Sequence, residues 1–418
     1  MQATPETPAP RTPSAQGAGL RILMVAPQPF FRPRGTPFSV LHRIRALTEA
    51  GHRVDLVTYP FGEAVEIPGL RIFRSPRLPG IRDVKIGPSL AKLLLDLPLY
   101  FMTRRLLREQ QYDILHSHEE AAFFAVHLAR RHGIKHIYDM HSSLPQQLRT
   151  FKSFDLWPIR ALFEALENRV LGTCDGVITI CADLEEIALA RCGDTPQAMI
   201  ENTGDDTKVF GKSDEQPRRD LGLEDRQIVL YTGTFETYQG LDLLLAAIAR
   251  LGASHPRVHL LMVGGRPPQI EHYREQARQL GIAERVSFTG MVNPLRIPAF
   301  LEAADVIASP RSRGTNTPLK IYGYMRTRRP LVATDLHTHT QTLDSSMACL
   351  VPPTPEGLAA GLARVLDDSD YARQLAEVAH ARAEASFSDA AYVRKVQDLY
   401  RAVLSADGAG ATTRTVLS

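Results

Sequence analysis

The sequence has few cysteines, and their spacing gives them no shared chemistry. Its 418 residues include 4 cysteines, Cys174, Cys181, Cys192 and Cys349, and no two have the Cys-x-x-Cys spacing of a zinc site or a redox pair. We therefore expect no metal site, and scattered free thiols favour a reducing cytosol. The first residues lack the apolar run of a signal peptide, and no segment is apolar over the length that spans a bilayer. These absences predict a cytoplasmic protein.

An excess of charge of either sign is also missing. Lys and Arg number 49 against 46 Asp and Glu, and the formal net charge of +3 gives no reason to expect nucleic acid as a partner. With 44% hydrophobic and 23% charged residues, the composition is that of an ordinary globular protein. The length is too great for a single core and predicts two domains of about 180 to 200 residues each.

Short apolar runs alternate with longer amphipathic ones, which is the pattern of parallel sheets with crossover helices. Helices are predicted between most of the strands, for example over 38–50 and 159–171. The predicted strands cover 21–26, 54–59, 70–74, 114–118, 136–141, 176–180 and 198–202 in the first half, and 228–232, 259–263, 286–289, 306–309 and 331–334 in the second.

Changes of composition divide the chain into six parts. They are a disordered tail over 1–18, a first domain over 19–210, a polar link over 211–226, a second domain over 227–387, a terminal helix over 388–405 that packs back on the first domain, and a second disordered tail over 406–418. The predicted fold is α/β, with two doubly wound, Rossmann-like domains that face a central cleft. Parallel sheets of this kind bind ligands at the carboxyl ends of their strands, so we expect a nucleotide on one wall of the cleft.

Local motifs make this expectation more specific. The first half contains Pro-Arg-Gly-Thr-Pro at 33–37, Tyr-Asp-Ile-Leu-His-Ser-His-Glu at 112–119 and Tyr-Asp-Met-His at 138–141. The second contains Tyr-Thr-Gly-Thr-Phe at 231–235, Val-Ser-Phe-Thr-Gly-Met-Val at 286–292 and Asn-Thr-Pro-Leu-Lys at 316–320. In this order, the stretches resemble those of glycosyltransferase family 4, whose members have two facing Rossmann-like domains, the GT-B fold.

The resemblance implies transfer of a hexosyl unit from a nucleotide-diphosphate sugar to a hydroxyl acceptor, with retention of configuration and without a metal or other cofactor. It implies that Gly35 and Thr36 approach the donor pyrophosphate at a helix N-terminus, and that His118 contacts the transferred sugar. Residues alone leave two alternatives open, since Gly35 also suits a plain turn, and His116 and His118 also suit a structural pair. His141 is a second candidate for the role of His118.

In the second domain, the resemblance places Gly233 at the donor site and the backbone near Val292 against the nucleobase. It also carries Asn202 and Asp206 over to a turn that closes the first domain, where they more readily brace the turn than contact substrate.

Several family positions are occupied by other residues. Two glutamates usually stand in the closing signature, but Gly323 holds the second position, and no acidic residue lies between 311 and 334. The family's phosphate-binding Arg and Lys align with Thr234 and Gln239, and a usual glycine is Arg328. Loss of these cations matters, because a diphosphate leaving group needs positive charge or aimed hydrogen-bond donors.

Lys320 is the candidate replacement for the lost charge, because it stands at the predicted start of the signature helix, where a lysine does not suit the helix dipole. A surface lysine is the competing interpretation. Three functions stay open: a hexosyltransferase that uses a different set of donor contacts, a non-catalytic sugar-nucleotide-binding homologue, and a sugar-nucleotide epimerase of the same architecture. An epimerase is expected to place carboxylates in the cleft, and the signature region has none.

The stretch 89–108 is unusually apolar, and its polar positions include four cations, Lys92, Arg104, Arg105 and Arg108. Basic amphipathic helices of this kind lie in bilayer interfaces, although Pro98 and burial against a sheet offer a structural explanation. The stretch predicts a lipid-linked acceptor or peripheral contact with the inner face of the membrane. The family resemblance implies a nucleotide sugar and a glycan or lipid-linked acceptor as partners.

Overall fold

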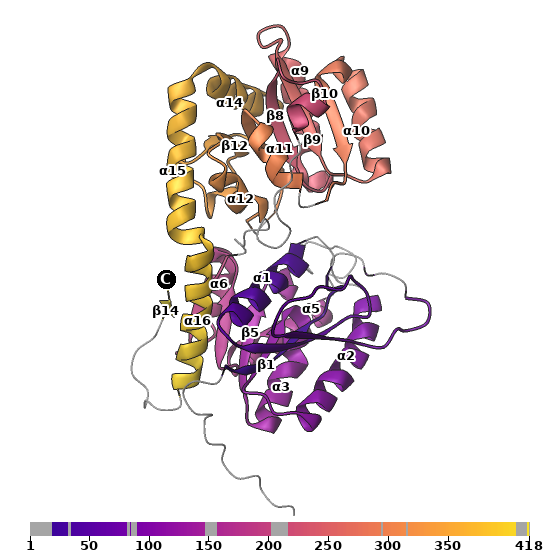
Figure 1. Ribbon diagram of the computed structural model, residues 1–418, viewed down its shortest axis with the longest axis vertical. Helices are drawn as coiled ribbons and strands as arrows, with labels where there is room; N and C mark the ends of the chain where they lie inside the picture. The colour runs from indigo at the N-terminus through magenta and orange to yellow at the C-terminus, as the bar shows by residue number, and fades with distance from the viewer. Residues whose placement is uncertain are drawn as a thin grey trace, which may run out of the picture.

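The computed structural model describes residues 19–31, 35–81, 84, 90–146, 157–201, 216–293, 296–314, 317–406 and 416–417. The predicted tail over 1–18 and the first part of the predicted link lie outside these residues. Two α/β domains lie one above the other, each built on its own parallel sheet (Figure 1). The prediction of two doubly wound, Rossmann-like domains is therefore confirmed.

The sheet of the first domain is parallel throughout and has the order β14-β7-β6-β5-β4-β1-β2-β3 within the described residues. Its strands are β1 (Arg21–Ala26), β2 (Arg53–Thr58), β3 (Leu70–Arg74), β4 (Ile114–His118), β5 (Lys135–Met140), β6 (Gly176–Thr179), β7 (Gln197–Met199) and β14 (Val416–Leu417). The predicted disordered tail over 406–418 therefore differs from the structure at 416–417, which pair with β7.

Alternation along each strand sends successive side chains to opposite faces of this sheet. On β1, Ile22 and Met24 face α1 and α16, whereas Leu23 and Val25 face α2 and α3. The helices of this domain are α1 (Gly35–Glu49), α2 (Leu90–Glu109), η1 (Glu119–Ala121), α3 (Ala122–His132), α5 (Trp157–Leu171) and α6 (Ala182–Leu189).

The sheet of the second domain has the order β10-β9-β8-β11-β12-β13 within the described residues. Its strands are β8 (Gln227–Thr232), β9 (Val258–Val263), β10 (Val286–Gly290), β11 (Val306–Ser309), β12 (Leu331–Thr334) and β13 (Cys349–Val351), of which only β13 was absent from the predicted strands. The helices are α8 (Pro217–Asp220), η3 (Thr237–Gln239), α9 (Leu241–Leu251), α10 (Pro267–Gln279), η4 (Ala283–Arg285), α11 (Ile297–Ala303), α12 (Lys320–Arg326), α13 (His337–Thr340) and α14 (Pro355–Asp367).

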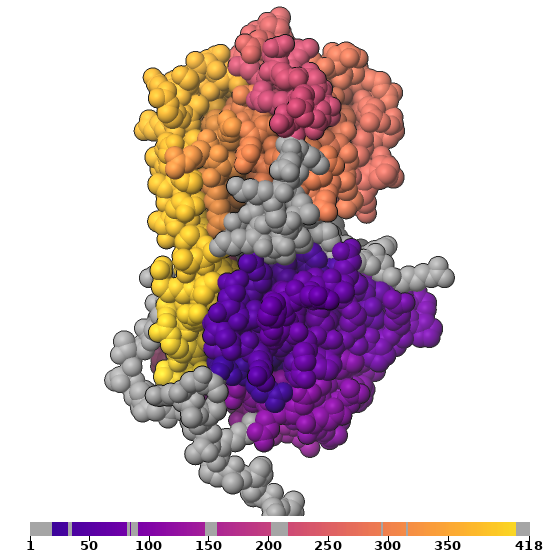
Figure 2. Space-filling view, in the orientation of Figure 1, coloured from indigo at the N-terminus to yellow at the C-terminus, as the bar shows by residue number. Residues whose placement is uncertain are grey.

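Two consecutive helices, α15 (Ser369–Phe387) and α16 (Asp389–Ser405), join the domains along one side of the molecule, where they form a continuous ridge (Figure 2). Ser388 separates them and caps α16, since its hydroxyl accepts a hydrogen bond from the amide of Ala391. α15 packs in the core of the second domain, and α16 packs in the core of the first. The last helix therefore belongs structurally to the first domain.

Candidate functional site

The two domains present their facing ends to a common junction. Because all paired strands are parallel, the carboxyl ends of each sheet lie at one edge, and α1, α6 and α12 lie beside the junction (Figure 1). A hydrogen bond crosses it, between Nε2 of His337 and Oδ1 of Asp183, at 2.6 Å. Ligands bind at such strand ends in α/β proteins, and the candidate site is therefore sought there.

In the first domain, the predicted catalytic residue lies in a fully buried polar cluster. His118 ends β4, and its Nδ1 lies 3.0 Å from Nε2 of His141, which follows β5. His116, two residues earlier on the same face of β4, pairs through Nδ1 with the hydroxyl of Tyr400 at 2.5 Å. The structure therefore brings together all three histidines that the sequence singled out, and it adds a residue of α16.

Asp139 lies at the centre of this cluster and was not singled out by its sequence context. It accepts a hydrogen bond from Nε of Arg43 at 2.9 Å, and its carboxylate is also 3.3 Å from Nε2 of His116 and 3.7 Å from Nδ1 of His118. Burial alone would raise the pKa of Asp139, but Arg43 and the imidazoles hold that pKa well below its usual range. Asp139 is therefore ionised and fixes the surrounding rings.

Burial lowers the pKa of His118 well below its usual range, so the imidazole is neutral. Its Nε2 is buried and has no hydrogen-bond partner within the described part of the chain. Buried nitrogens without a partner are rare in native proteins. Nη1 and Nη2 of Arg43, in the same cluster, also have no hydrogen-bond partner in the described residues, so His118 Nε2 is one of several candidates for a ligand contact. His116, His118 and Asp139 each place a possible metal-ligand atom within 4.8 Å of the others. Because Arg43 already pairs with Asp139, a cation would add to a buried positive charge, and we assign an ion-pair cluster here.

A second polar cluster begins at the next residue. The hydroxyl of Thr36 at the start of α1 donates to Oε1 of Glu119 at 3.3 Å, and Nζ of Lys92 lies 3.3 Å from Glu120 and 3.9 Å from Glu119. Burial raises the pKa of Glu119 to about 7. Glu119 has φ of 49°, a left-handed conformation uncommon for a residue other than glycine, which supports a functional interpretation of this turn. Gly35 begins α1 beside Thr36.

In the second domain, the structure brings three predicted donor residues together. Nζ of Lys320, the first residue of α12, donates to the carbonyl of Thr232 at 3.2 Å and to Oε1 of Gln239 at 3.3 Å. Gly233 follows β8 with φ of 134°, and a Cβ built on it would lie 3.5 Å from Nζ of Lys320. The ammonium also lies 4.0 Å from the ring centre of Tyr231. The structure therefore places a basic side chain from a different helix beside Gln239.

A cationic side chain, that of Arg311, lies near Lys320. Burial, and then the Arg311 guanidinium, lower the pKa of Lys320 well below its usual range. Nη1 of Arg311 donates to Oγ1 of Thr338 at 2.8 Å, and burial lowers the pKa of the nearby His339 to about 4. A side chain placed on Gly323 would meet nothing within 4 Å, so the position of the family's second glutamate is open space. Two basic side chains therefore lie close together here.

The remaining predicted residues lie around these clusters or outside the described part. Thr234 accepts a hydrogen bond from the hydroxyl of Tyr231 through its carbonyl, at 2.7 Å. Val292 follows β10, is half-buried and packs against the core beside α11 and α12. Asn202 and Asp206 lie outside the described residues. In the described residues, no helix is both long and apolar enough to cross a membrane.

Comparison with known proteins agrees with this arrangement. Residues 33–204 match the profile described as Glycosyltransferase Family 4, and residues 226–368 match that of Glycosyl transferases group 1. A phosphatidyl-myo-inositol mannosyltransferase of Mycolicibacterium smegmatis is 26% identical over 403 residues, which cover 94% of this chain and 98% of that protein.

Solved structures share the fold over nearly the whole length. Sucrose-phosphate synthase of Thermosynechococcus elongatus superposes with a TM-score of 0.72 and 22% identity, covering 93% of this chain and 100% of that one. The Anabaena protein HepE, solved in complex with UDP, gives a TM-score of 0.69 and 18% identity, covering 91% of this chain and 100% of that one. Because both halves match and the two domains have this shared architecture, the chain belongs to glycosyltransferase family 4 and is a glycosyltransferase of the GT-B type.

Proposed function

We propose that the protein transfers a hexosyl unit from a nucleotide-diphosphate sugar to a hydroxyl acceptor, with retention of anomeric configuration. The observation that carries the proposal is the position of Lys320, whose ammonium lies beside Gln239 and Gly233 at the carboxyl end of β8. A pyrophosphate leaving group gains negative charge as the glycosidic bond breaks, and a preorganised cation there stabilises it. HepE, of the same fold, was solved with UDP.

The donor would be held mainly by the second domain. Gly233 leaves room for the pyrophosphate beside Lys320, Thr234 and Gln239 offer hydrogen bonds, and the backbone at Val292 contacts the base. From the first domain, the amides at Gly35 and Thr36 at the start of α1 face the phosphates, as helix N-termini do in anion sites. Arg311 adds a second positive charge near Lys320.

The reacting sugar would lie at the end of β4. Neutral His118 offers its Nε2 to a sugar hydroxyl or to the reacting centre, and His141 and Asp139 hold the ring in place. Retention requires that the acceptor approach the same face that the diphosphate leaves. If Lys320 carries the leaving-group charge, the transfer needs no metal. Protein groups alone would then perform the reaction.

The acceptor would be a glycan or a lipid-linked molecule. The relative from M. smegmatis is named a phosphatidyl-myo-inositol mannosyltransferase. In this chain, α2 leaves an apolar face exposed: Leu93, Leu94, Leu97 and Phe101 are between 54% and 59% exposed. Leu95 and Leu99, on the opposite face, are buried against the sheet. We therefore extend the proposal to peripheral contact with the cytoplasmic face of a membrane.

Sedimentation with anionic vesicles tests this contact. The double variant Leu93→Gln/Leu97→Gln should lose vesicle binding, while Leu221→Gln, an exposed leucine 41% accessible in the second domain, should keep it. If the wild-type protein does not sediment with vesicles at low salt, membrane contact is wrong, and the transferase proposal is unaffected.

A panel of UDP-, GDP- and ADP-hexoses tests the transferase proposal itself. The matching donor should raise the unfolding temperature by mass action and should slowly release free sugar without an acceptor. Nuclear magnetic resonance of that sugar, taken before mutarotation, reports whether configuration is retained. An epimerised nucleotide sugar would identify the epimerase alternative, and binding without any turnover would identify the non-catalytic one.

A further inference from the structure

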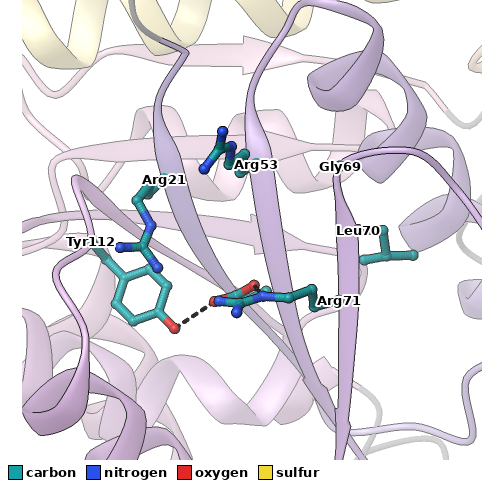
Figure 3. A pocket seen from close by; sticks show the side chains of 7 residues that line it. Arg21, Arg53, Gly69, Leu70, Arg71 and Tyr112 are labelled. Atoms are coloured by element: carbon teal, nitrogen blue, oxygen red, sulfur yellow. Dashed lines mark hydrogen bonds and ion pairs between the residues drawn. The ribbon is translucent and has the colours of Figure 1, made fainter.

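A cavity of 380 Å³ opens at the amino ends of β1, β2 and β3. Three arginines line it, Arg21, Arg53 and Arg71, together with Asp55 and Tyr112 (Figure 3). The strands are parallel, so this edge of the sheet is opposite to the edge that holds His118 at the end of β4. The volume is within the range of small-molecule sites. The cavity therefore lies apart from the transferase site.

Strand register brings the arginines together. Arg21 on β1 is the direct neighbour of Arg53 on β2, and Asp55 on β2 is the direct neighbour of Arg71 on β3. Residues opposite each other on adjacent strands lie about 5 Å apart, and like charges in such pairs are destabilising. The Asp55–Arg71 pair follows this rule, whereas the Arg21–Arg53 pair breaks it.

The described side chains compensate only one of the three positive charges directly. Nε of Arg71 donates to Oδ1 of Asp55 at 2.7 Å, its Nη2 pairs with the second carboxylate oxygen, and the Tyr112 hydroxyl donates to the same oxygen at 2.7 Å. Arg21 stacks over the ring of Tyr112, with its guanidinium carbon 5.4 Å from the ring centre. The ion pair therefore forms one wall of the cavity, and Tyr112 lies between it and Arg21.

A neutral residue stands where a counter-charge would be expected. Oε1 of Gln110 accepts hydrogen bonds from Nη2 of both Arg21 and Arg71, each at 2.8 Å. The nearby carboxylate of Asp113 accepts from the backbone amide of Arg21 rather than from its guanidinium. Arg53 is exposed and has no side-chain partner within the described residues. Two guanidinium groups thus face the cavity without a carboxylate of their own.

We propose that this cavity binds a phosphomonoester through Arg21 and Arg53, as a second ligand site separate from the transferase site. Guanidinium groups present several N–H donors in a plane and suit phosphate oxygens, and two of them match the double charge of a phosphomonoester. Leu70 and the Tyr112 ring provide apolar walls for the carbon skeleton of the ligand. The phosphate belongs either to a free phosphorylated metabolite or to a lipid headgroup.

Two probes distinguish these sources. The first is sn-glycerol 3-phosphate, titrated calorimetrically at constant ionic strength, and the second is a phosphatidylcholine vesicle with and without phosphatidic acid. Arg21→Gln and Arg53→Gln should each weaken binding at least about tenfold, because each removes a charge-assisted contact to phosphate. Arg394→Gln serves as a matched control, since Arg394 is an exposed arginine of α16 outside the cavity.

Arg53→Gln removes no side-chain contact of the described residues, so we expect this variant to fold as the wild type does. Its unfolding temperature, measured without ligand, checks this expectation. Binding of either probe that is lost in both variants and kept in the control supports the site, and the probe that binds identifies the source of the phosphate. Absence of binding to the wild-type protein, or an equal loss in Arg394→Gln, overturns the proposal. Nucleoside diphosphate affinity should be unchanged in both variants, and a parallel loss there would show that the cavity is not a separate site.

Discussion

Replacement of Lys320 by methionine should weaken nucleoside diphosphate binding and leave nucleoside binding nearly unchanged. The ammonium lies 3.3 Å from Gln239 Oε1 and 3.2 Å from the Thr232 carbonyl, so a phosphate oxygen that takes the place of either contact would lie at a similar distance. Two unit charges about 4 Å apart interact by about 4 kcal/mol at an effective dielectric constant of about 20. Desolvation offsets part of this, and we expect a loss of at least about 1.4 kcal/mol, or tenfold in affinity.

The pH dependence of binding gives a second signature of Lys320. Burial and Arg311 lower the pKa of this lysine, and a bound diphosphate stabilises its charged form. Binding therefore raises the pKa of Lys320 and takes up a proton wherever the free protein has the neutral amine. Affinity should fall as pH rises through the lowered pKa, and Lys320→Met should lack this dependence.

Calorimetry with the nucleoside diphosphate and with the bare nucleoside measures both effects. Tyr324→Phe is the matched control, because the Tyr324 hydroxyl donates to the same Thr232 carbonyl at 3.2 Å but carries no charge. An equal loss for both ligands in Lys320→Met, or a similar loss in Tyr324→Phe, would indicate a distorted β8 terminus. No loss for either ligand would refute the assignment and make Arg311 the next residue to test.

Three further changes test the first domain. His118→Ala should reduce transfer below detection while nucleotide affinity stays within about twofold, and substantial turnover in this variant would remove His118 from the reaction. Asp139→Asn should lower the free energy of unfolding in urea by about 3–5 kcal/mol, because it leaves Arg43 buried without its counter-charge, whereas Arg45→Gln on the surface should cost under about 1 kcal/mol. Glu119→Gln should stabilise the protein at pH 8 but not at pH 4: the folded-state pKa of Glu119 is raised to about 7, so the stabilisation by its protonated form is present at low pH and is lost as pH rises through that value. Thermal unfolding across this range measures the difference, and a pH-independent effect would contradict the assigned pKa.

Strand positions were predictable because each buried run of a parallel sheet is bounded by polar or turn residues. The strands 21–26, 70–74, 114–118, 306–309 and 331–334 have the predicted limits. β13, Cys349–Val351, was missed although it ends an apolar run that begins at Met347 and stops before Pro352. Arg328 stands where the family usually has a glycine. Its φ is 54°, a left-handed conformation that glycine adopts without strain, so the backbone conformation is kept although the residue has changed.

The candidate site was predictable only where local motifs carried it. Lys320 could be singled out because its charge conflicts with the helix start, but its contact with Gln239, 81 residues earlier, depends on the packing of α12 against β8. Asp139 lies inside the Tyr-Asp-Met-His motif, of which only the histidine was singled out, and Arg43 lies in no motif. Their pairing depends on the docking of α1 on the sheet. The bond between His116 and Tyr400 joins residues 284 positions apart, which no local pattern specifies.

The position of α16 has a consequence for synthesis of the protein on the ribosome. Domains usually fold in the order in which they emerge, the N-terminal one first. Here the core of the first domain includes Tyr392, Val396, Leu399, Tyr400 and Val403, which are translated after nearly all of the second domain. Until α16 is translated, the face of the first sheet that carries Ile22 and Met24 is partly uncovered. Folding of the first domain is therefore completed only when the last helix leaves the exit tunnel.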